Sequence, residues 1–573
     1  MIRARIRGRL LPALIVTLLL PAAAWAAPAP EAAPQPPAED VRNAIAAGEF
    51  TAWFQNATAW LNERATARAD QATLISLIDR PDVRRVLDGR QVIAACGAGE
   101  LGAFAKAAPA NQTFLTWLLS DTETMDLLLE GAAPLKLGAR EKNQSHLKVA
   151  SLEILRKILA GDGDAKGGLC RKLAIATALA PPGTGAPGAG HAKPPVDPVE
   201  RYMHFKQAHR NGELVPSFDK LTVWEYQKVV QSGASNEDLA WGRRMIGTFR
   251  PDLLEDETVV NSTSFVWRRN APPEHYPYKD MRYVLAGGGK CGPRSSWAVF
   301  ICQAWGVPAI GVGQPGHACV AFRSANPMAQ PQPGNVWKVA YGRGWEVSKL
   351  EGMSGPEFLQ AVRERSHAKV FSRIEHLRWL AAAVTPEKKS AAILQVLNAM
   401  RTSLAEAKSE IPAAPVRPVS VKTDSGSSRP IGPVGGVIHV LAAAFTKTGG
   451  QISWGGQFPH VLVHHGPTGQ PQVYFQQQMK SQWADYLIDV PAAGTYRLVM
   501  QAACVNDHQV LEFCSGDKML AQVAIPLTYG LWQETSPVEL RLDKGVQTLR
   551  VQTPTTEHKR GIALQSFKLK SKD

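Results

Sequence analysis

Two residues, Cys291 and His317, have the residue types and the surroundings that nucleophilic acyl chemistry needs. Cys291 follows a glycine run at 287–289, and Pro293 fits the first turn of a helix, where a missing N–H costs nothing. Apolar residues then recur at helical spacing as far as Gly306, which ends the predicted helix. We therefore expect the thiol at the positive end of a helix dipole, which favours thiolate over thiol.

The histidine is expected at the beginning of a strand. Residues 309–313 and 318–322 predict two short strands, and His317 precedes the second. A histidine there can face the helix-borne thiol of Cys291, accept its proton and later return that proton to a leaving group. A packed, inert thiol and a merely hydrogen-bonded histidine are the alternatives.

A third group that would orient the imidazole of His317 is less obvious. The next expected strand, 337–341, carries no acid, and no aspartate occurs between positions 280 and 424. Asn335 is one candidate, because an amide orients the histidine in papain-type triads. Glu346 is a second candidate, and Asn335 could equally cap a loop.

These residues resemble the transglutaminase-like superfamily, which shares a papain-like arrangement. The resemblance covers about 276–350 and rests on a Gly-x-Cys segment, a helix closing in Cys-x-Ala-x-Gly-Val-Pro-Ala, and Gly-His-Ala opening a strand. It implies an α+β domain with Cys291 as nucleophile and His317 as general base and acid. It also implies amide-bond chemistry, as hydrolysis, deamidation or cross-linking through a thioester. The aspartate that is common in this family after the histidine is missing here.

Around this centre the chain predicts a multidomain protein. Its 573 residues exceed what one compact core accounts for, and 45% hydrophobic residues argue against wholesale disorder. Helical spacing over 41–180 predicts an α-helical N-terminal domain, and the Pro/Gly-rich stretch 181–198 a linker. We expect the α+β transglutaminase-like domain with helical flanks at 199–407 and an all-β sandwich at 437–570.

The C-terminal region alternates apolar and polar residues in short runs separated by turns, which is typical of a β-sandwich. Its strand pattern with a Pro-x-x-Gly-Thr-Tyr turn at 491–496 resembles the carbohydrate-binding-module families. That resemblance implies glycan binding on aromatic faces, for which Trp454, Tyr529 and Trp532 are the candidates; Trp532 could instead fill the core. The family's acidic calcium signature is not evident, since 439–444 contains no acid.

The first 26 residues have the features of a Sec-type signal peptide: an Arg-rich start, an apolar run and a small-residue site, with cleavage expected after Ala26. The protein is then exported to the periplasm or beyond, with no transmembrane span after cleavage; an uncleaved anchor is the alternative. Four arginines of the leader contribute to the net charge of +14. The remaining charge is mild for this length, and we expect no nucleic-acid partner.

Neither a metal nor a cofactor is expected. The pair His464-His465 and the seven cysteines lack the spacings of a zinc site, and the glycines before Cys291 lack those of a phosphate-binding loop. Cys302 and Cys319 could form a disulfide, although packing is favoured.

The preferred hypothesis is an exported cysteine-dependent acyl-transfer enzyme that acts on protein or peptide-containing envelope material, with a possible glycan contact through the sandwich. The alternative is a non-catalytic periplasmic or surface scaffold that binds glycan or protein and has a degenerate transglutaminase-like core.

Overall fold

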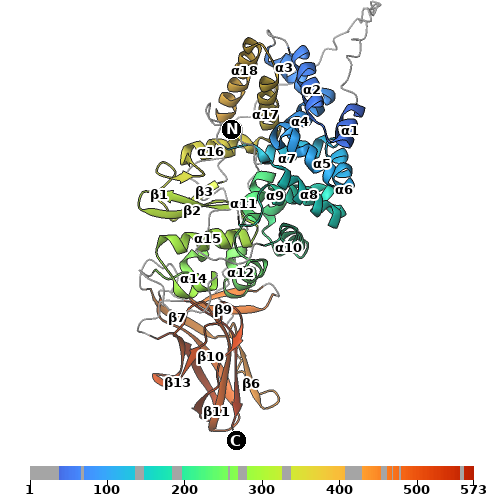
Figure 1. Ribbon diagram of the computed structural model, residues 1–573. Coiled ribbons are helices and arrows are strands. Elements are labelled where there is room, and N and C mark those ends of the chain that lie inside the picture. The colour runs from blue at the N-terminus through green and yellow to red at the C-terminus, as the bar shows by residue number, and fades with distance from the viewer. Residues whose placement is uncertain are drawn as a thin grey trace, which may run out of the picture.

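The computed structural model describes residues 38–65, 70–135, 147–183, 196–255, 258–268, 281–324, 337–406, 429–452, 461–466, 469–476, 479–554 and 561–572. Figure 1 shows a helical region, a middle region with a small sheet, and an all-β region, arranged in this order along the long axis of the molecule. The expected multidomain organisation, with helices at the N-terminal side and a β-sandwich at the C-terminal side, is confirmed. The predicted signal peptide lies outside the described residues.

The N-terminal region is built from short helices whose apolar faces share one core. Aspartates begin two of these helices, since Asp70 accepts from the backbone N–H of Thr73 at 2.8 Å and Asp121 from that of Thr124 at 3.0 Å. The helices are α1 (Ala38–Ala47), α2 (Thr51–Arg64), α3 (Gln71–Ile78), α4 (Pro81–Cys96), α5 (Ala98–Ala107), α6 (Pro109–Leu118), α7 (Thr122–Ala132), α8 (Val149–Gly161), the 3-10 helix Gly163–Lys166 and α9 (Gly168–Leu179).

The middle region begins with further helices and then forms the small sheet. Its elements before the sheet are α10 (Pro198–Arg210), the 3-10 helix Pro216–Lys220, α11 (Val223–Val230), α12 (Asn236–Phe249), α13 (Asp252–Glu255), the 3-10 helix Val259–Phe265, α14 (Met281–Gly287) and α15 (Cys291–Ala304). The strands are β1 (Ala309–Gln314), β2 (His317–Arg323), β3 (Trp337–Ala340), β4 (Lys349–Leu350) and β5 (Met353–Ser354). They pair antiparallel in the order β3-β2-β1-β4-β5.

The small sheet lies between two helices. Alternate residues of β2 point to opposite faces, so Val320 belongs to the large core with α15 whereas Cys319 and Ala321 pack with Phe358 of α16 (Gly355–Ser366). Helix α15 crosses β1 and β2, and α16 contacts β4 and β5. The packing of α15 on β1 and β2 places the start of α15 next to the start of β2.

The last two helices return to the N-terminal region. Helix α17 (Ala368–Ala383) contacts α2, α3, α4 and α7, and α18 (Glu387–Glu406) packs along α17. Arg373 pairs with Asp79, and His376 with Asp88 at 2.8 Å. In space, the helical flank expected for the middle domain therefore belongs with the N-terminal helices.

The C-terminal region consists of two antiparallel sheets packed face to face. Rings from both sheets meet in its core: Phe567 lies with its centroid 5.2 Å from that of Tyr486 and 5.3 Å from that of Phe513. One sheet has the order β13-β12-β16-β10-β7; the other has the order β14-β11-β17-β9-β8, with β15 on β11 and β6 on β17. The strands are β6 (Val437–Leu441), β7 (Lys447–Ile452), β8 (Leu462–His465), β9 (Pro471–Phe475), β10 (Met479–Val490), β11 (Gly494–Cys504), β12 (Gln509–Ser515), β13 (Lys518–Ile525), β14 (Gln533–Glu534), β15 (Val538–Leu542), β16 (Gly545–Gln552) and β17 (Ile562–Ser571).

The sandwich is joined to the middle region by apolar and polar contacts around α12. The rings of Phe249 and Tyr474 meet edge to face at 5.5 Å between centroids. Gln472 donates to the carbonyl of Thr248 at 2.8 Å, and Trp241 Nε1 donates to the carbonyl of Tyr529 at 3.2 Å. These contacts are buried or half-buried, and side chains of both regions join one hydrophobic core.

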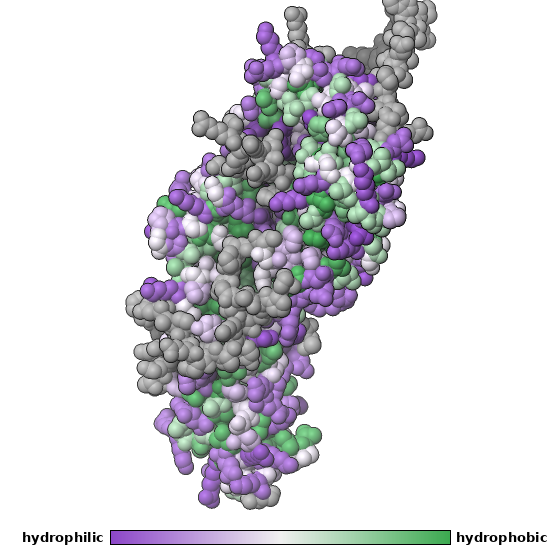
Figure 2. Space-filling model, in the orientation of Figure 1, coloured by the Kyte–Doolittle hydropathy of each residue, from purple (hydrophilic) through white to green (hydrophobic). Residues whose placement is uncertain are grey.

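The surface mixes residue types. On the face shown in Figure 2, hydrophilic residues cover much of the helical region and of the sandwich, with hydrophobic residues interspersed. Within the described ranges, none of the helices combines the length and the apolar character needed to cross a bilayer.

Candidate functional site

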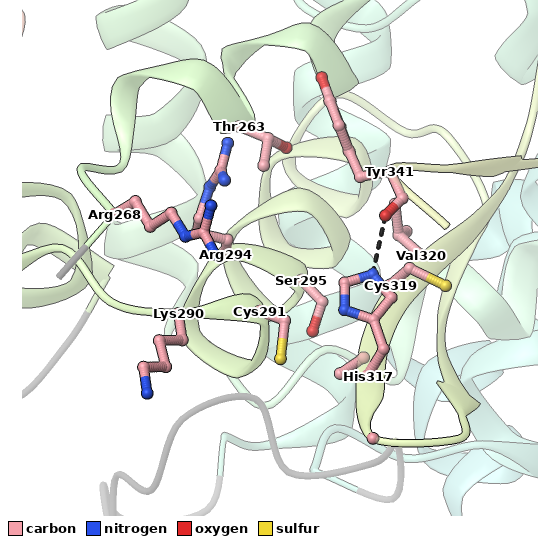
Figure 3. A pocket seen from close by; sticks show the side chains of 12 residues that line it. Thr263, Arg268, Lys290, Cys291, Arg294, Ser295, His317, Cys319, Val320 and Tyr341 are labelled. Atoms are coloured by element: carbon pink, nitrogen blue, oxygen red, sulfur yellow. Dashed lines mark hydrogen bonds between the residues drawn. The ribbon is translucent and has the colours of Figure 1, made fainter. Parts of the chain in front are cut away.

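A pocket of about 420 Å³ lies where the start of α15 meets the start of β2, and both Cys291 and His317 line it. Figure 3 shows the Cys291 side chain on one side of the pocket and the imidazole of His317 on the other, with one ring nitrogen on the side of Cys291. Ser295, one turn along α15, places its hydroxyl beside them. The structure thus brings together the two residues that the sequence singled out as nucleophile and base.

Cys291 is the first residue of helix α15, with Lys290 before it as the N-cap residue. The side chain of Lys290 does not cap the helix. The first N–H groups of a helix have no carbonyl partner within the helix, so those of Cys291 and Gly292 are directed out of its start. Donors in this position suit the oxygen of a reacting carbonyl group and also stabilise a thiolate.

The glycine run before Cys291 is required by close packing. Gly288 has φ +71°, and a Cβ there would clash with the carbonyl oxygen of Trp267. The neighbouring Gly289 donates its N–H to that same oxygen at 2.7 Å, and a Cβ on it would lie within 2.7 Å of the Pro293 ring. The segment that ends at Trp267 therefore holds the loop that presents the thiol.

His317 opens strand β2 directly after the turn at Pro315 and Gly316, where Gly316 has φ +62°. Its register partner across the hairpin is Gln314 on β1. His317 Nε2 lies 2.8 Å from the main-chain carbonyl oxygen of Tyr341, as the dashed line in Figure 3 shows. A carbonyl can only accept, so Nε2 carries the proton and Nδ1, the nitrogen facing the thiol, is the acceptor.

The carbonyl of Tyr341 reaches the imidazole because the chain turns sharply after β3. Tyr341 has φ +60°, a left-handed conformation that costs a residue with a side chain about 1 to 3 kcal/mol. The next residue, Gly342, has no room for a side chain, since a Cβ would lie 2.8 Å from Cys319 Sγ and 2.8 Å from Val339 Cγ1. Such strain close to a pocket is the kind that persists at functional sites.

In the described structure, the group that orients the imidazole of His317 is a main-chain carbonyl and not a side chain. The hydrogen-bond partner of His317 Nε2 is the Tyr341 carbonyl, and Glu346, one of the two candidates, is exposed. Asn335, the other candidate, lies outside the described residues. The sequence did not point to Tyr341, because every residue has a main-chain carbonyl and no residue type marks the one that is used. The only indication in the sequence is a strand end without an acid, followed by a glycine.

The aromatic residues expected to bind glycan are differently placed. Tyr529, with φ +52°, and Trp532 are half-buried against the core shared with the middle region, and Tyr529 accepts from Trp241. Gly530 between them approaches Met245 so closely that a Cβ would clash with it. Both aromatics therefore lie at the contact between regions, whereas Trp454 lies outside the described residues.

Two thiols of the middle region, Cys302 and Cys319, contrast with Cys291 in their burial. All seven cysteines are unpaired, so Cys302 and Cys319 are packed rather than bridged. Burial raises the pKa of Cys319 to about 11, and it also raises the pKa of Cys302. Such thiols stay protonated and inert near neutral pH, whereas Cys291 is only half-buried and faces the pocket.

A second cluster of ionisable groups lies between α4, α7 and α17, away from the pocket. Ligand atoms of Asp88, Asp126 and His376 lie within 4.8 Å of one another, which makes these the described residues that could hold a metal ion. The group is already paired internally: His376 Nε2 lies 2.8 Å from Asp88 and 3.4 Å from Asp126, and Arg84 binds Asp126 at 2.5 Å. These contacts fit a structural ion-pair network.

The charges of this network follow from its geometry. Burial opposes a charge on His376, but the hydrogen bonds to Asp126 and Asp88 outweigh it and raise the pKa of His376 to about 10. Its Nδ1 lies 2.7 Å from the carbonyl of Ser372 and donates to it. Glu130 has a pKa raised to about 7, mainly by burial and then by the charge of Asp126. His376 is therefore a buried cation at neutral pH.

Comparisons with known proteins concern the sandwich alone. No protein-family model matches the chain, and no curated protein matches it. A segment covering 24% of this chain is similar to the C-terminal family 6 carbohydrate-binding module of a laminarinase from Zobellia galactanivorans, with 14% identity, 99% of that chain and a TM-score of 0.20.

Two further solved structures are similar to the same part of the chain. One is a module of lichenase 5A from Cellvibrio mixtus in complex with cellotriose, with 16% identity over 24% of this chain and 97% of the other and a TM-score of 0.20. The second, a β-1,3-glucan-binding module from Bacillus halodurans, has 13% identity over 25% of this chain and all of the other, with a TM-score of 0.21. The all-β architecture stands on the strand pairing itself.

Proposed function

We propose that the protein is a cysteine-dependent acyl-transfer enzyme acting on an amide bond of protein or peptide-containing envelope material. The observation that carries this proposal is the presence in one pocket of a helix-start thiol, Cys291, and of His317, whose far nitrogen is anchored on the Tyr341 carbonyl at 2.8 Å. The anchor sets the tautomer in which Nδ1 can take the thiol proton.

The reaction follows from these groups. The Cys291 thiol gives its proton to His317 Nδ1, and the thiolate attacks the amide carbonyl, whose oxygen is stabilised by the N–H groups at the start of α15. The imidazolium then protonates the amine as the C–N bond breaks, which leaves a thioester on the sulfur. Water or a second amine attacks the thioester and restores the thiol.

The Tyr341 carbonyl does part of the work of a carboxylate. It holds the ring and fixes the tautomer of His317, but it carries no full negative charge to stabilise an imidazolium. We therefore expect the site to be slower than a site with an aspartate in this position, while keeping the same order of steps.

An activated ester tests the proposal without knowledge of the natural substrate. With p-nitrophenyl acetate, the wild type is expected to release nitrophenol and to form an acetyl thioester on the Cys291 peptide, detected by mass spectrometry and discharged by hydroxylamine. Cys291→Ala should form none, and His317→Ala should form and discharge it about 100-fold more slowly. Equal acetylation of Cys291 in wild type and His317→Ala would contradict the proposal.

A non-catalytic scaffold is the second candidate function. The feature that favours it is the absence of a carboxylate partner for His317 in the described structure, since a site that lost its acid could keep its shape for binding alone. A folded protein whose Cys291 reacts with ester and alkylating reagents no faster than His317→Ala would support the scaffold.

The sandwich is proposed to bind a glycan, on the resemblance of its strand and turn pattern to carbohydrate-binding modules, and the protein is proposed to work in the periplasm or outside the cell. Because Tyr529 and Trp532 lie at the contact with the middle region, Trp454 is the first residue to test. Glycan pull-down by wild type that Trp454→Ala loses supports the proposal, and binding to no envelope glycan would remove it.

A further inference from the structure

Among the described residues that line the pocket of Cys291 and His317, three side chains are cationic and none is acidic. Arg268 precedes the segment outside the described structure, Lys290 is the residue before Cys291, and Arg294 lies in the first turn of α15. In Figure 3 the side chains of Arg268 and Arg294 lie close together on one side of the pocket, and Lys290 lies on the same side as the sulfur of Cys291. The described lining of the pocket therefore carries a net positive charge.

These cations lack the partners that other arginines of the middle region have. Arg323 binds Glu225 at 2.9 Å, and Arg243 binds Glu213 at 3.0 Å. By contrast, Arg268, Lys290 and Arg294 form no ion pair with a carboxylate of the described chain. The Nε of Arg294 is buried and has no hydrogen-bond partner.

The position of Arg294 is unfavourable for the folded protein by itself. A positive charge in the first turn of a helix opposes the helix dipole, and a buried N–H donor without an acceptor costs about 1 to 3 kcal/mol. Two guanidinium groups on one wall repel each other as well. An anion that accepts from Arg294 and Arg268 would relieve all three costs at once.

We propose that the pocket binds a carboxylate of the substrate next to the reacting amide, and that Arg294 and Arg268 are the residues that recognise it. This inference rests on the proposed function and names its substrate class: a peptide with an acidic side chain or a free carboxyl terminus beside the amide bond. Arginine suits this task, since its planar guanidinium can bind both oxygens of a carboxylate.

A simpler role for the same cations is to stabilise the Cys291 thiolate. The two roles differ in what they predict for reagents of different charge. A cation that acts only by raising the thiolate fraction changes the reactivity of Cys291 toward neutral and anionic reagents by the same factor, and its unspecific attraction for an anion is screened by added salt. A cation that binds a carboxylate accelerates only the reagent that carries one.

Iodoacetate and iodoacetamide provide this comparison, since they differ in little more than a carboxylate. The measured quantity is the ratio of their rate constants at Cys291, followed by mass spectrometry, with the same thiol in urea-unfolded protein as reference. The ratio is expected to be about tenfold higher in the folded protein. Arg294→Gln and Arg268→Gln should each lower it, and the double variant should lower it further, toward the unfolded value, with Lys290 as the remaining cation among the described lining residues. Arg497→Gln, an exposed change on the sandwich, is the charge-matched control and should leave it unchanged.

A ratio equal to that of the unfolded chain, or variants that slow both reagents equally, would overturn the inference. The proposed function has its own readout in the same experiment, because it requires iodoacetamide to alkylate Cys291 faster in wild type than in His317→Ala. A failure of that comparison with a raised iodoacetate ratio would leave an anion-binding pocket without catalysis.

The source of the carboxylate is resolved by protection against iodoacetamide. N-acetylglycine offers a free carboxyl terminus, and the α-amide of N-acetylaspartate offers an acidic side chain. Protection of Cys291 by one of them, abolished in Arg294→Gln, identifies the source and supports the inference. Protection by neither at millimolar concentration would contradict it.

Discussion

His317 and His376 make the same hydrogen bond to a main-chain carbonyl, but the groups around their second ring nitrogen differ. Each imidazole uses one nitrogen to donate to a main-chain carbonyl, that of Tyr341 at 2.8 Å and that of Ser372 at 2.7 Å. The other nitrogen of His317 faces a thiol in a pocket, whereas that of His376 is enclosed by Asp88 and Asp126.

The difference shows what the environment adds to a fixed tautomer. A buried carboxylate, Asp88, and a half-buried one, Asp126, hold His376 as a cation that ties α17 to α4 and α7. Beside the free nitrogen of His317, the described lining of the pocket offers a thiol and no carboxylate. The first arrangement fits a structural role, and the second fits the proposed chemistry.

The largest expected effect separates the two histidines by activity. His317→Ala should lower nitrophenol release from p-nitrophenyl acetate by about 100-fold, because the thiol loses its base, with little change in the urea midpoint. His376→Ala should leave release within about threefold in protein that remains folded. Similar losses from both variants would break the comparison.

The next effect separates them by stability. His376→Ala removes the cationic partner of the buried carboxylate of Asp88, whereas Asp126 keeps Arg84, so we expect the helical region to lose about 3 kcal/mol of unfolding free energy. The measurement is the first transition in urea, followed by tryptophan fluorescence. An unchanged transition would show that Asp88 and Asp126 do not depend on the cation.

A pH series sharpens the same point. The pKa of His376 is raised from 6.5 to about 10, so its contribution to stability is fully present below pH 6.5 and is lost as the pH rises through 10. The urea midpoint of wild type should therefore fall between pH 7 and pH 10 by more than that of His376→Gln. Parallel curves for the two proteins would rule out a charged His376.

Gly342→Ala tests the carbonyl anchor of His317. A Cβ at this position meets Cys319 and Val339 at 2.8 Å, so the turn must shift and the Tyr341 carbonyl must move with it. We expect nitrophenol release to fall about tenfold, in line with the sensitivity of catalysis to small displacements. Tyr341→Gly keeps the carbonyl and relieves the strain at φ +60°, so it should stay within about threefold of wild type.

The smallest effect concerns Glu130, beside the His376 network. Its pKa is raised from 4.5 to about 7, so its contribution to stability is present below pH 4.5 and is lost as the pH rises through 7. Glu130→Gln should therefore gain about 2 kcal/mol relative to wild type between pH 5 and pH 8. A gain in stability that is the same at every pH would show that it does not come from the ionisation of Glu130.

The parts of the site that local sequence determines could be predicted. Glycines and Pro293 around Cys291 mark a helix start, and a turn before His317 marks the opening of a strand, because both signals lie within a few residues. The hydrogen bond from His317 to the Tyr341 carbonyl could not be predicted, because it uses a main-chain atom and depends on where β3 ends relative to β2.

Contacts between segments that are distant in the chain also could not be predicted from the sequence. Alternating strands predict a sandwich, but the placement of Tyr529 and Trp532 against α12 depends on how two regions dock. In the same way, the apolar stripe of α17 predicts a helix without saying that its partners are α2 to α7. Sequence patterns therefore predict helices and strands more reliably than they predict which of these elements pack against one another.

The most direct measurement is the pH dependence of iodoacetamide alkylation at Cys291, resolved by mass spectrometry, in wild type and His317→Ala. If the imidazole holds the sulfur as a thiolate, wild type reacts about 100-fold faster than the variant at pH 6, and the two rates converge above pH 9. Superimposable profiles, with ordinary thiol reactivity in both proteins, would contradict the pairing of Cys291 with His317.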